Sequence, residues 1–373
     1  MKLHVLQENL EKYLNFANKF TSNKAQLPVL ANIKLSAKNG KLSISSTNLE
    51  ISYNTLIGAK VKKEGEITVP ANVICDIVSN LNSGPIELSS EKENLNIKSS
   101  DFSSLVSGMN SSDFPKIPEK LLKDNISLSK KDFVDSLMKV LYSVSTDETR
   151  PVLTGVLFIF DKDSLIMVAT DGFRLSRKRI KVAKILDIQK MIIPKSVLFE
   201  MTRLVFDEED VKLSFSKDDN QVIFAMGSMI LSSRVIEGNF PDFEKVIPKE
   251  HGLEVTLDKE ELSQAIKLAS VFARDSANMI KFKVKKNILT VSSESQYSGK
   301  QEKNIDANVK DDNNILSKGF EIAFNFRFLE DFLNIAKGEE ILIQFSDPNS
   351  PGVFLDSKDN KFLHLIMPVK IQS

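Results

Sequence analysis

The sequence predicts an α+β fold made of three repeated domains, each a pseudo-two-fold pair of units that join one helix to an antiparallel sheet. Three observations support this: short motifs that recur at nearly constant spacing, helical apolar patterns that recur with them, and alternating apolar and polar runs between the helices. The predicted domains span residues 1–122, 123–249 and 250–373. A chain of 373 residues is consistent with two or three domains of about 100–200 residues each.

The repeat is clearest between the first two domains, where four short motifs return in the same order. The run LPVL at residues 27–30 returns as RPVL after 123 residues, and TNLE at residues 47–50 returns as TDGF after the same interval. The run VPAN at residues 69–72 returns as IPKS after 124 residues, and DFP at residues 113–115 returns as NFP after 126. Four ordered matches at nearly one spacing indicate two copies of one domain.

Each domain also contains a first helix with apolar residues at helical spacing, and this helix is the main mark of the third copy. These first helices are expected to open at residues 5–10, 128–133 and 257–262. Ser129 and Asp258 are expected N-caps. Second helices are expected at residues 71–81, 195–206 and 326–336. Pro70 and Pro194 support two of them. The first amides of a helix have no intrahelical acceptor, so a proline at the helix start costs no hydrogen bond.

Between the helices, apolar and polar residues alternate in runs such as LSISSTNLEISY, VLFIFDKDSLIMVATD and FKVKKNILTVSSES. Alternation of this kind is typical of antiparallel strands with one buried face. The pair Asn39-Gly40 is expected to form a hairpin turn. Each domain is therefore expected to hold more strands than helices.

The composition argues against several classes of protein. Lys plus Arg and Asp plus Glu both number 50, so the formal net charge is zero, whereas proteins that hold nucleic acid by charge alone are usually basic. No stretch reaches the roughly 20 apolar residues of a membrane span. Glu8 and Glu11 stand where a signal peptide would be apolar. The single cysteine, Cys75, is expected to be a small buried hydrophobe, and we expect a cytoplasmic location.

The sequence contains no recognisable catalytic constellation. It has no glycine-rich phosphate-binding motif, and its three histidines, His4, His251 and His364, lack metal-site spacing. The SxxK match at residues 127–130 lacks its companion motifs. Asp171, in ATDGFRL, is the one candidate acid, but the dipeptide Asp-Gly favours a turn. We therefore expect no enzyme, no metal site and no cofactor.

Several motifs together resemble the bacterial DNA sliding clamp family, the beta subunit of DNA polymerase III. They are LPVLANI (27–33), TNLEISY (47–53), TVPAN (68–72), ATDGFRLS (169–176), EGNFPDFEKVIPK (237–249) and LIMPVKI (365–371). The resemblance covers essentially the whole chain. It implies the DNA clamp fold, with two subunits joined head to tail in a ring that encircles duplex DNA and tethers polymerases without catalysis. Retention by topology accounts for the zero net charge.

The resemblance also implies a hydrophobic pocket between the second and third domains. It binds a short linear motif of the polymerase III catalytic subunit, of clamp loader subunits and of other proteins with a clamp-binding motif. The matching positions are Leu153, Thr170, Gly172, Phe173, Arg174, Leu175, Pro241, Lys245, Val246, Asn325, Phe328, Met367, Pro368, Val369 and Lys370. Leu175, Val246, Met367 and Pro368 are expected to supply the apolar wall. Ordinary core packing is the alternative for Leu153 and Val246.

In the family, helices line the central hole and carry basic residues. The matching basic residues here are Lys12, Lys19, Lys131, Lys139, Lys195, Arg203, Lys259, Lys267, Arg327 and Lys337. Lys24 and Arg150 match loop positions that contact DNA in relatives. For each residue alone, a solvated surface is the alternative. Together they predict contact with phosphates and no reading of base sequence.

Two further expectations concern assembly and function. Val271 and Phe272, at the end of an expected helix, are expected to meet Phe102 and Val106 of an expected edge strand across a homodimer contact. Two other functions stay open at this point. One is a repeat-built adaptor that binds proteins without encircling DNA, and the other is an enzyme that uses Asp171, Arg174 and Lys245.

Overall fold

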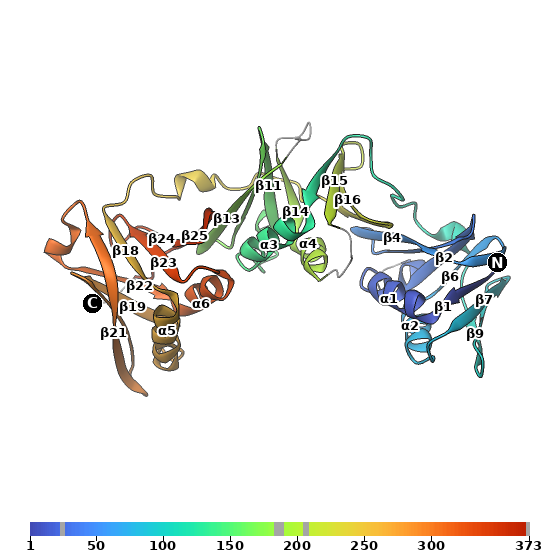
Figure 1. The fold of residues 1–373 in the computed structure, drawn as a ribbon, viewed down its shortest axis with the longest axis horizontal. Helices are drawn as coiled ribbons and strands as arrows, with labels where there is room; N and C mark the ends of the chain where they lie inside the picture. The colour runs from blue at the N-terminus through green and yellow to red at the C-terminus, as the bar shows by residue number, and fades with distance from the viewer. Residues whose placement is uncertain (23–26, 183–189, 204–208, 371–373) are drawn as a thin grey trace. The chain divides into compact units, whose positions relative to one another are not determined.

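The computed structural model describes residues 1–22, 27–182, 190–203 and 209–370. Its described part contains six α-helices (Figure 1). They are α1 (Gln7–Asn18), α2 (Ala71–Ser79), α3 (Lys130–Leu141), α4 (Lys195–Thr202), α5 (Lys259–Ala273) and α6 (Phe326–Ile335). The prediction of two helices per repeat is confirmed. Among the described residues, no helix has both the length and the apolar character that a membrane span requires.

The helices begin later than the sequence pattern suggested, because a strand precedes each first helix. The residues expected to open those helices at 5, 128 and 257 belong to strands β1 (Lys2–Leu6), β10 (Asn125–Ser129) and β18 (Leu253–Asp258). Burial alternates along these strands before the helical pattern starts. Asp258 is an N-cap as predicted, since its Oδ1 accepts a hydrogen bond from the Glu261 amide at 2.8 Å.

In the part of the chain that the structure describes, the strands form three sheets, and their pairs are all antiparallel. The first contains, in order, β5 (Lys60–Lys63), β1, β7 (Pro85–Glu91), β8 (Asn94–Lys98) and β9 (Ser103–Ser107). The second contains β10, β15 (Asp210–Ser216), β16 (Gln221–Met226), β17 (Met229–Arg234), β4 (Ile51–Gly58), β3 (Lys41–Thr47), β2 (Asn32–Lys38) and β6 (Gly65–Pro70). The Asn39-Gly40 turn joins β2 to β3 as predicted, with positive φ at both residues.

The third sheet has twelve strands. In order they are β14 (Lys190–Pro194), β11 (Gly155–Asp161), β12 (Ser164–Thr170), β13 (Arg174–Lys181), β25 (Asp359–Ile366), β24 (Gly352–Asp356), β23 (Glu340–Phe345), β18, β21 (Gly299–Asp311), β20 (Ile288–Ser295), β19 (Met279–Lys285) and β22 (Phe320–Asn325). The pairing of β13 with β25 carries this sheet across the predicted boundary between the second and third domains. The pairing of β4 with β17 does the same for the first boundary.

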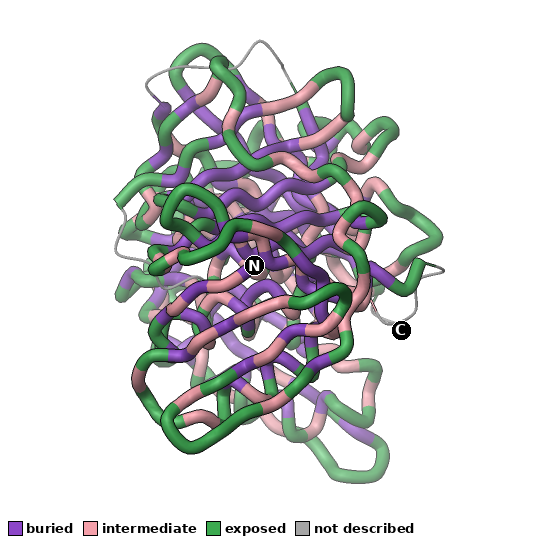
Figure 2. The backbone as a smooth tube through the Cα atoms, turned by 90° about the vertical axis from the view of Figure 1, so that its right-hand side faces the viewer, coloured by how far each residue is buried: buried purple, intermediate pink, exposed green. Residues whose placement is uncertain are grey.

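By compactness the chain divides into two units. One contains residues 1–130 and 205–235, and the other contains residues 131–204 and 236–373. The three domain boundaries given above stay a prediction from the repeat. In the first unit α1 packs on α2, and in the second α5 packs on α6 (Figure 1). Buried stretches run through the strands and helices, while exposed stretches gather at the turns (Figure 2).

The cores are built from the apolar faces that the sequence pattern marks. In the second unit, Phe320, Phe324, Phe332, Phe345 and Phe354 are almost fully buried and form a chain of ring contacts. Cys75 is buried on α2 as predicted, and burial raises the pKa of its thiol to about 12. A thiol with so high a pKa is inert, which agrees with a packing role.

Candidate functional site

The candidate site centres on the turn between β12 and β13. The hydroxyl of Thr170 accepts a hydrogen bond from the Gly172 amide at 3.0 Å and donates one to the Arg174 carbonyl at 2.6 Å. Asp171 Oδ1 accepts from the amides of Phe173 and Arg174, at 2.9 and 3.0 Å. Gly172 has φ of 95°, a conformation that favours glycine. The carboxylate of Asp171 is thus committed to holding the turn, as its Asp-Gly context predicted.

Arg174 ties this turn to neighbouring elements. Its Nε donates to Asp171 at 3.0 Å and its Nη2 donates to the Tyr142 carbonyl at 2.7 Å. Its Nη1 pairs with Asp331 on α6, and its guanidinium lies 4.5 Å from the centre of the Phe328 ring. The ring of Phe328 therefore serves as a face for this cation. The side chain of Arg174 is fixed by its partners at the edge of the site.

Beside this turn lies a contiguous apolar cluster. Its buried members are Leu157, Ile166, Val168, Leu175, Ile192, Phe243, Val353 and Leu365. Its half-buried members are Val152, Ile159, Ile236, Phe240, Ile247, Leu355, Leu363 and Met367. We call these sixteen residues the apolar floor. It lies on one face of the sheet formed by β11 to β13 with β24 and β25, next to an exposed Phe173.

The end of the chain completes the site. Leu175 pairs with Leu365 across β13 and β25. Beyond β25, the Met367 amide donates to the Phe173 carbonyl at 2.8 Å, and the Val369 amide donates to the Ala323 carbonyl at 2.8 Å. Residues 367–370 are thereby held alongside both the turn and β22, and all but Lys370 are half-buried.

The predicted pocket residues fall into three groups by their exposure to solvent. Leu153, Thr170 and Leu175 are buried. Arg174, Asn325, Phe328, Met367, Pro368 and Val369 are half-buried. Gly172, Phe173, Pro241, Lys245, Val246 and Lys370 are exposed. Leu175 and Met367 belong to the apolar floor, whereas Asn325 caps α6 by accepting from the Arg327 amide.

Several floor residues were not singled out from the sequence. Val168, Leu363 and Leu365 could have been found from the two-residue alternation of their strands, and Phe240 and Phe243 lie within the GNFPDF motif. Val353 and Leu355 gave no local signal, because only the pairing of β24 with β25 brings them to the floor.

A buried polar network lies around β13 and β25. His364 is fully buried, and its Nδ1 lies 2.9 Å from the Ser176 hydroxyl and 3.1 Å from the Tyr142 hydroxyl. Its ring stacks on Phe332 with centroids 5.4 Å apart. Its Nε2 has no hydrogen-bond partner among the described residues. Burial, and then the charge of Arg174, lowers the pKa of His364 to about 3, so this imidazole is neutral at neutral pH.

This lowered pKa predicts acid sensitivity of the fold. The unfolded chain binds a proton at His364 below its ordinary pKa of about 6.5, and the folded chain does not until about pH 3. The stabilising contribution is therefore complete above pH 6.5 and is lost as pH falls from 6.5 toward 3. From pH 7 to pH 5, we expect His364 to reduce the free energy of unfolding by about 2 kcal/mol. Urea unfolding at several pH values measures this slope.

The matched variants are His364→Leu and His251→Leu. His364→Leu should flatten the decline between pH 7 and pH 5, whereas His251→Leu, at an exposed histidine, should leave it in place. An undiminished decline in His364→Leu would show that other groups cause the acid sensitivity.

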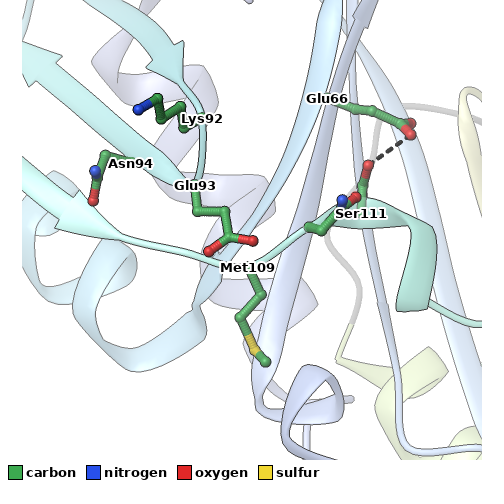
Figure 3. A pocket seen from close by; sticks show the side chains of 7 residues that line it. Glu66, Lys92, Glu93, Asn94, Met109 and Ser111 are labelled. Atoms are coloured by element: carbon green, nitrogen blue, oxygen red, sulfur yellow. Dashed lines mark hydrogen bonds between the residues drawn. The ribbon is translucent and has the colours of Figure 1, made fainter.

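A separate hollow lies on the first unit, with a volume of about 550 Å³. Glu66, Lys92, Glu93, Asn94 and Met109 line it with residues 110 and 111 (Figure 3). The Glu66 carboxylate already accepts from the Ser111 hydroxyl at 2.7 Å and pairs with Lys34 at 2.9 Å. None of the predicted site residues lies here.

Comparison with known proteins identifies the family. Models of the DNA polymerase III beta subunit match the chain in three consecutive parts: the N-terminal domain at residues 1–118, the central domain at 127–242 and the C-terminal domain at 244–370. The chain belongs to the DNA polymerase III beta subunit family. The sequence resemblance is thereby confirmed.

Individual relatives agree with this assignment. The chain is 28% identical to the beta sliding clamps of Staphylococcus aureus and Staphylococcus epidermidis, over 99% of each chain. It matches the crystal structure of the DNA polymerase sliding clamp from Bacillus subtilis with a TM-score of 0.93 and 25% identity, over 100% of both chains. The beta subunit structure from Thermotoga maritima shares the fold, with a TM-score of 0.90 and 24% identity over 100% of both chains.

The basic residues matched to the family's DNA-facing positions differ in their surroundings. Lys12, Lys19, Lys131, Arg203, Lys267 and Arg327 are exposed on or at the ends of helices. Arg150 and Lys337 are exposed and ion-paired, with Asp147 and Asp135. Lys195 is half-buried, and burial lowers its pKa. Lys259 is half-buried and donates to the Ala336 carbonyl at the end of α6. Lys24 lies outside the described residues.

The prediction that Lys139 faces DNA is wrong. Its side chain is 4% exposed and pairs with Asp135 on α3 at 2.8 Å and with Asp359 on β25 at 2.5 Å. Burial disfavours its charge, but hydrogen bonds to the two carboxylates outweigh burial and raise its pKa. Lys178 shares Asp359 with it. The helical periodicity of α3 did not reveal this, because the deciding partner comes from a strand about 220 residues later.

The four residues predicted at the dimer contact differ in their exposure to solvent. Val271 is 58% exposed and Phe272 is half-buried at the end of α5. Phe102 is exposed beside β9, which is an edge strand of the first sheet. Val106 is only 5% exposed because its side chain points into its own domain, whereas Leu105, its neighbour on the other face, is 61% exposed. Leu105 is the exposed apolar side chain of this edge.

Proposed function

We propose that this chain is a sliding clamp that encircles duplex DNA as a head-to-tail homodimer and tethers polymerases to it. The observation that carries the proposal is the three-part family match, which runs from residue 1 to residue 370. The internal repeat supports it, because a ring needs equivalent segments in succession. The site on β13 and β25 is the proposed dock for a short apolar motif of the catalytic subunit, of clamp loader subunits and of other clamp-binding proteins.

The apolar floor supports this docking role. Peptide sites hold an aliphatic or aromatic anchor in an apolar cleft with a few polar groups at its edge. Here the floor includes the half-buried Met367, and the turn beside it carries the exposed Phe173 and the fixed guanidinium of Arg174. A methionine at the rim can adapt to more than one partner sequence.

We propose no catalytic role for the chain. The candidate acid, Asp171, is used by backbone amides and by Arg174. Among the described residues, no group of three His, Cys, Asp or Glu side chains is arranged to hold a metal ion. A processivity factor of this family works on chromosomal DNA, so we propose that the chain acts in the cytoplasm.

The net charge of zero favours retention on DNA by encirclement over retention by charge. The two ways of staying on DNA respond differently to salt. A protein held by 6–10 phosphate contacts loses roughly 10³–10⁵ in affinity between 50 and 200 mM salt. A closed ring leaves only by opening or by sliding off an end. Once loaded with a clamp loader and ATP onto nicked circular DNA, the protein is expected to persist through moderate salt. Cutting the same circle once should release it promptly.

Gel filtration of loaded DNA before and after cutting measures this release. Protein that has not been loaded should bind linear duplex only weakly, and blocking both ends of the cut DNA should restore retention. Equal retention on circular and open-ended linear DNA would refute encirclement and favour the adaptor alternative.

A further inference from the structure

The turn at the candidate site has a second copy in the first repeat, at residues 47–52. There the Thr47 hydroxyl accepts from the Leu49 amide at 3.0 Å and donates to the Ile51 carbonyl at 2.9 Å. Asn48 Oδ1 accepts from the amides of Glu50 and Ile51, at 3.1 and 2.8 Å. These four hydrogen bonds repeat those of Thr170 and Asp171 one for one.

The strand that crosses this turn is copied as well. Strand β4 pairs with β17 as β13 pairs with β25, and Ser52 lies opposite Ser232 as Leu175 lies opposite Leu365. At the end of β17, the Arg234 amide donates to the Glu50 carbonyl at 2.9 Å. It matches the bond from the Met367 amide to the Phe173 carbonyl at 2.8 Å. The backbone of the docking site therefore occurs twice in the chain.

The two copies differ in what their side chains offer. The floor positions Leu157, Val168, Leu175, Ile192 and Leu365 correspond in strand register to Lys34, Ser45, Ser52, Thr68 and Ser232. Each of these polar side chains bonds a side chain of the same sheet. The hydroxyls of Ser52 and Ser232 lie 2.6 Å apart, and Asn54 donates to Ser43 and Ser45 at 2.8 Å.

On the opposite face of the sheet, the copy on β4 carries apolar side chains and the copy on β13 and β25 carries polar ones. Behind β4, Tyr53 packs in a buried ring cluster with Phe16 and Phe20. Behind β13 and β25 lie Ser176 and His364, in the polar network described above. The polarity of the strand is thus inverted between the two copies. The repeated fold does not require apolar residues on this face of β13, because the first copy folds with hydroxyls at the matching positions.

The turn itself differs at one residue. Gly172 corresponds to Leu49, and both have positive φ, at 95° and 76°. A Cβ added at Gly172 would lie 3.2 Å from Arg150 Nη1, and apart from its chain neighbours no other heavy atom would lie within 4 Å. Leu49 is 49% exposed at the matching place. A leucine in this conformation is strained, yet the first copy shows that the turn tolerates it.

We infer that the chain contains two copies of one docking framework and that only the copy on β13 and β25 accepts an apolar peptide anchor. The copy on β4 and β17 is closed, because its face presents hydroxyls bonded within the sheet instead of apolar side chains, so an apolar anchor gains no apolar contact there, and because Leu49 stands at the turn in place of Gly172. The residues that select between the copies are Leu175, Leu365 and Gly172. This inference rests on the proposed peptide-docking function.

The deciding experiment converts the open copy to the closed one with Leu175→Ser and Leu365→Ser together. At this register the two serines can bond each other as Ser52 and Ser232 do. Fluorescence anisotropy with a labelled peptide of the glutamine-leucine-aspartate-leucine-phenylalanine type measures binding. The native chain is expected to bind one peptide, and the serine pair to weaken binding by about 100-fold or more. The control pair, Ser52→Ala with Ser232→Ala, should bind like the native chain.

Circular dichroism and thermal unfolding report whether the serine pair folds. If it does not, Gly172→Leu on the exposed turn decides, and it is expected to weaken binding by about tenfold or more. Native-like binding by a folded serine pair or by Gly172→Leu, or two peptides bound per native chain, would overturn the inference while leaving the docking function intact. Failure of the native chain to bind the peptide would overturn both.

Discussion

Replacing Leu175 and Met367 together with alanine is expected to abolish binding of the motif peptide in calorimetry. Both side chains belong to the apolar floor, and Met367 is half-buried at its rim. Truncating two central anchors of a peptide site costs at least about 2 kcal/mol each. The combined loss corresponds to roughly a thousandfold weaker binding. A peptide of micromolar affinity would no longer be detected.

This variant also weakens the fold, and the control must account for that. Leu175 is only 3% exposed, so its truncation should lower the free energy of unfolding by about 2–5 kcal/mol. Leu88→Ala, at a fully buried position in the first sheet, removes the same side-chain atoms as Leu175→Ala from the unit that does not contain the site. Leu88→Ala should lose comparable stability and keep full peptide affinity. Undiminished affinity in the Leu175 and Met367 variant would place the peptide elsewhere.

Phe272→Ala is expected to weaken the homodimer by at least about 2 kcal/mol, or roughly thirtyfold in the dissociation constant. Phe272 is half-buried within one chain at the end of α5, beside the exposed Val271 and Leu268. An exposed apolar stripe on a helix is costly in water unless a partner covers it. Sedimentation velocity over a dilution series measures the change.

Leu105→Ala on the edge strand β9 should weaken the dimer in the same way. If Leu105 and Phe272 meet across the contact, the double variant should lose less than the sum of the two single losses. Met138→Ala, at an exposed position on α3, is the control and should dimerise normally. An unchanged dissociation constant for Phe272→Ala would refute this assignment of the contact.

Much of the architecture was predictable, because each part of it has a local cause. The runs LPVL and RPVL both form short 3₁₀ helices, at Pro28–Ala31 and Pro151–Leu153. The prolines Pro70 and Pro194 stand directly before α2 and α4. The role of Asp171 as a turn residue also followed from its neighbours in the sequence. Repeats, periodicities and caps act over a few residues, so the sequence displays them directly.

The direction of particular side chains was less predictable. Val106 and Leu105 are adjacent apolar residues on one strand, and the sequence pattern favoured the one that the structure buries. The sequence predicted Lys139 on a basic helix face, yet two carboxylates hold it in the interior. A long charged side chain is buried only where partners from elsewhere in the chain compensate the lost hydration. Such partners have no fixed spacing in sequence.

The sequence by itself therefore determined the repeat, the two helices of each repeat, the turn chemistry and the membership of the family. Only the tertiary structure decided which face of each repeated strand is apolar, how Arg174 is held against Phe328, and where the buried charge of Lys139 and the buried neutral imidazole of His364 lie. Those features depend on the pairing of β13 with β25, which joins residues about 190 positions apart. Local patterns follow from the geometry of a single element, whereas burial and charge pairing follow from which elements meet.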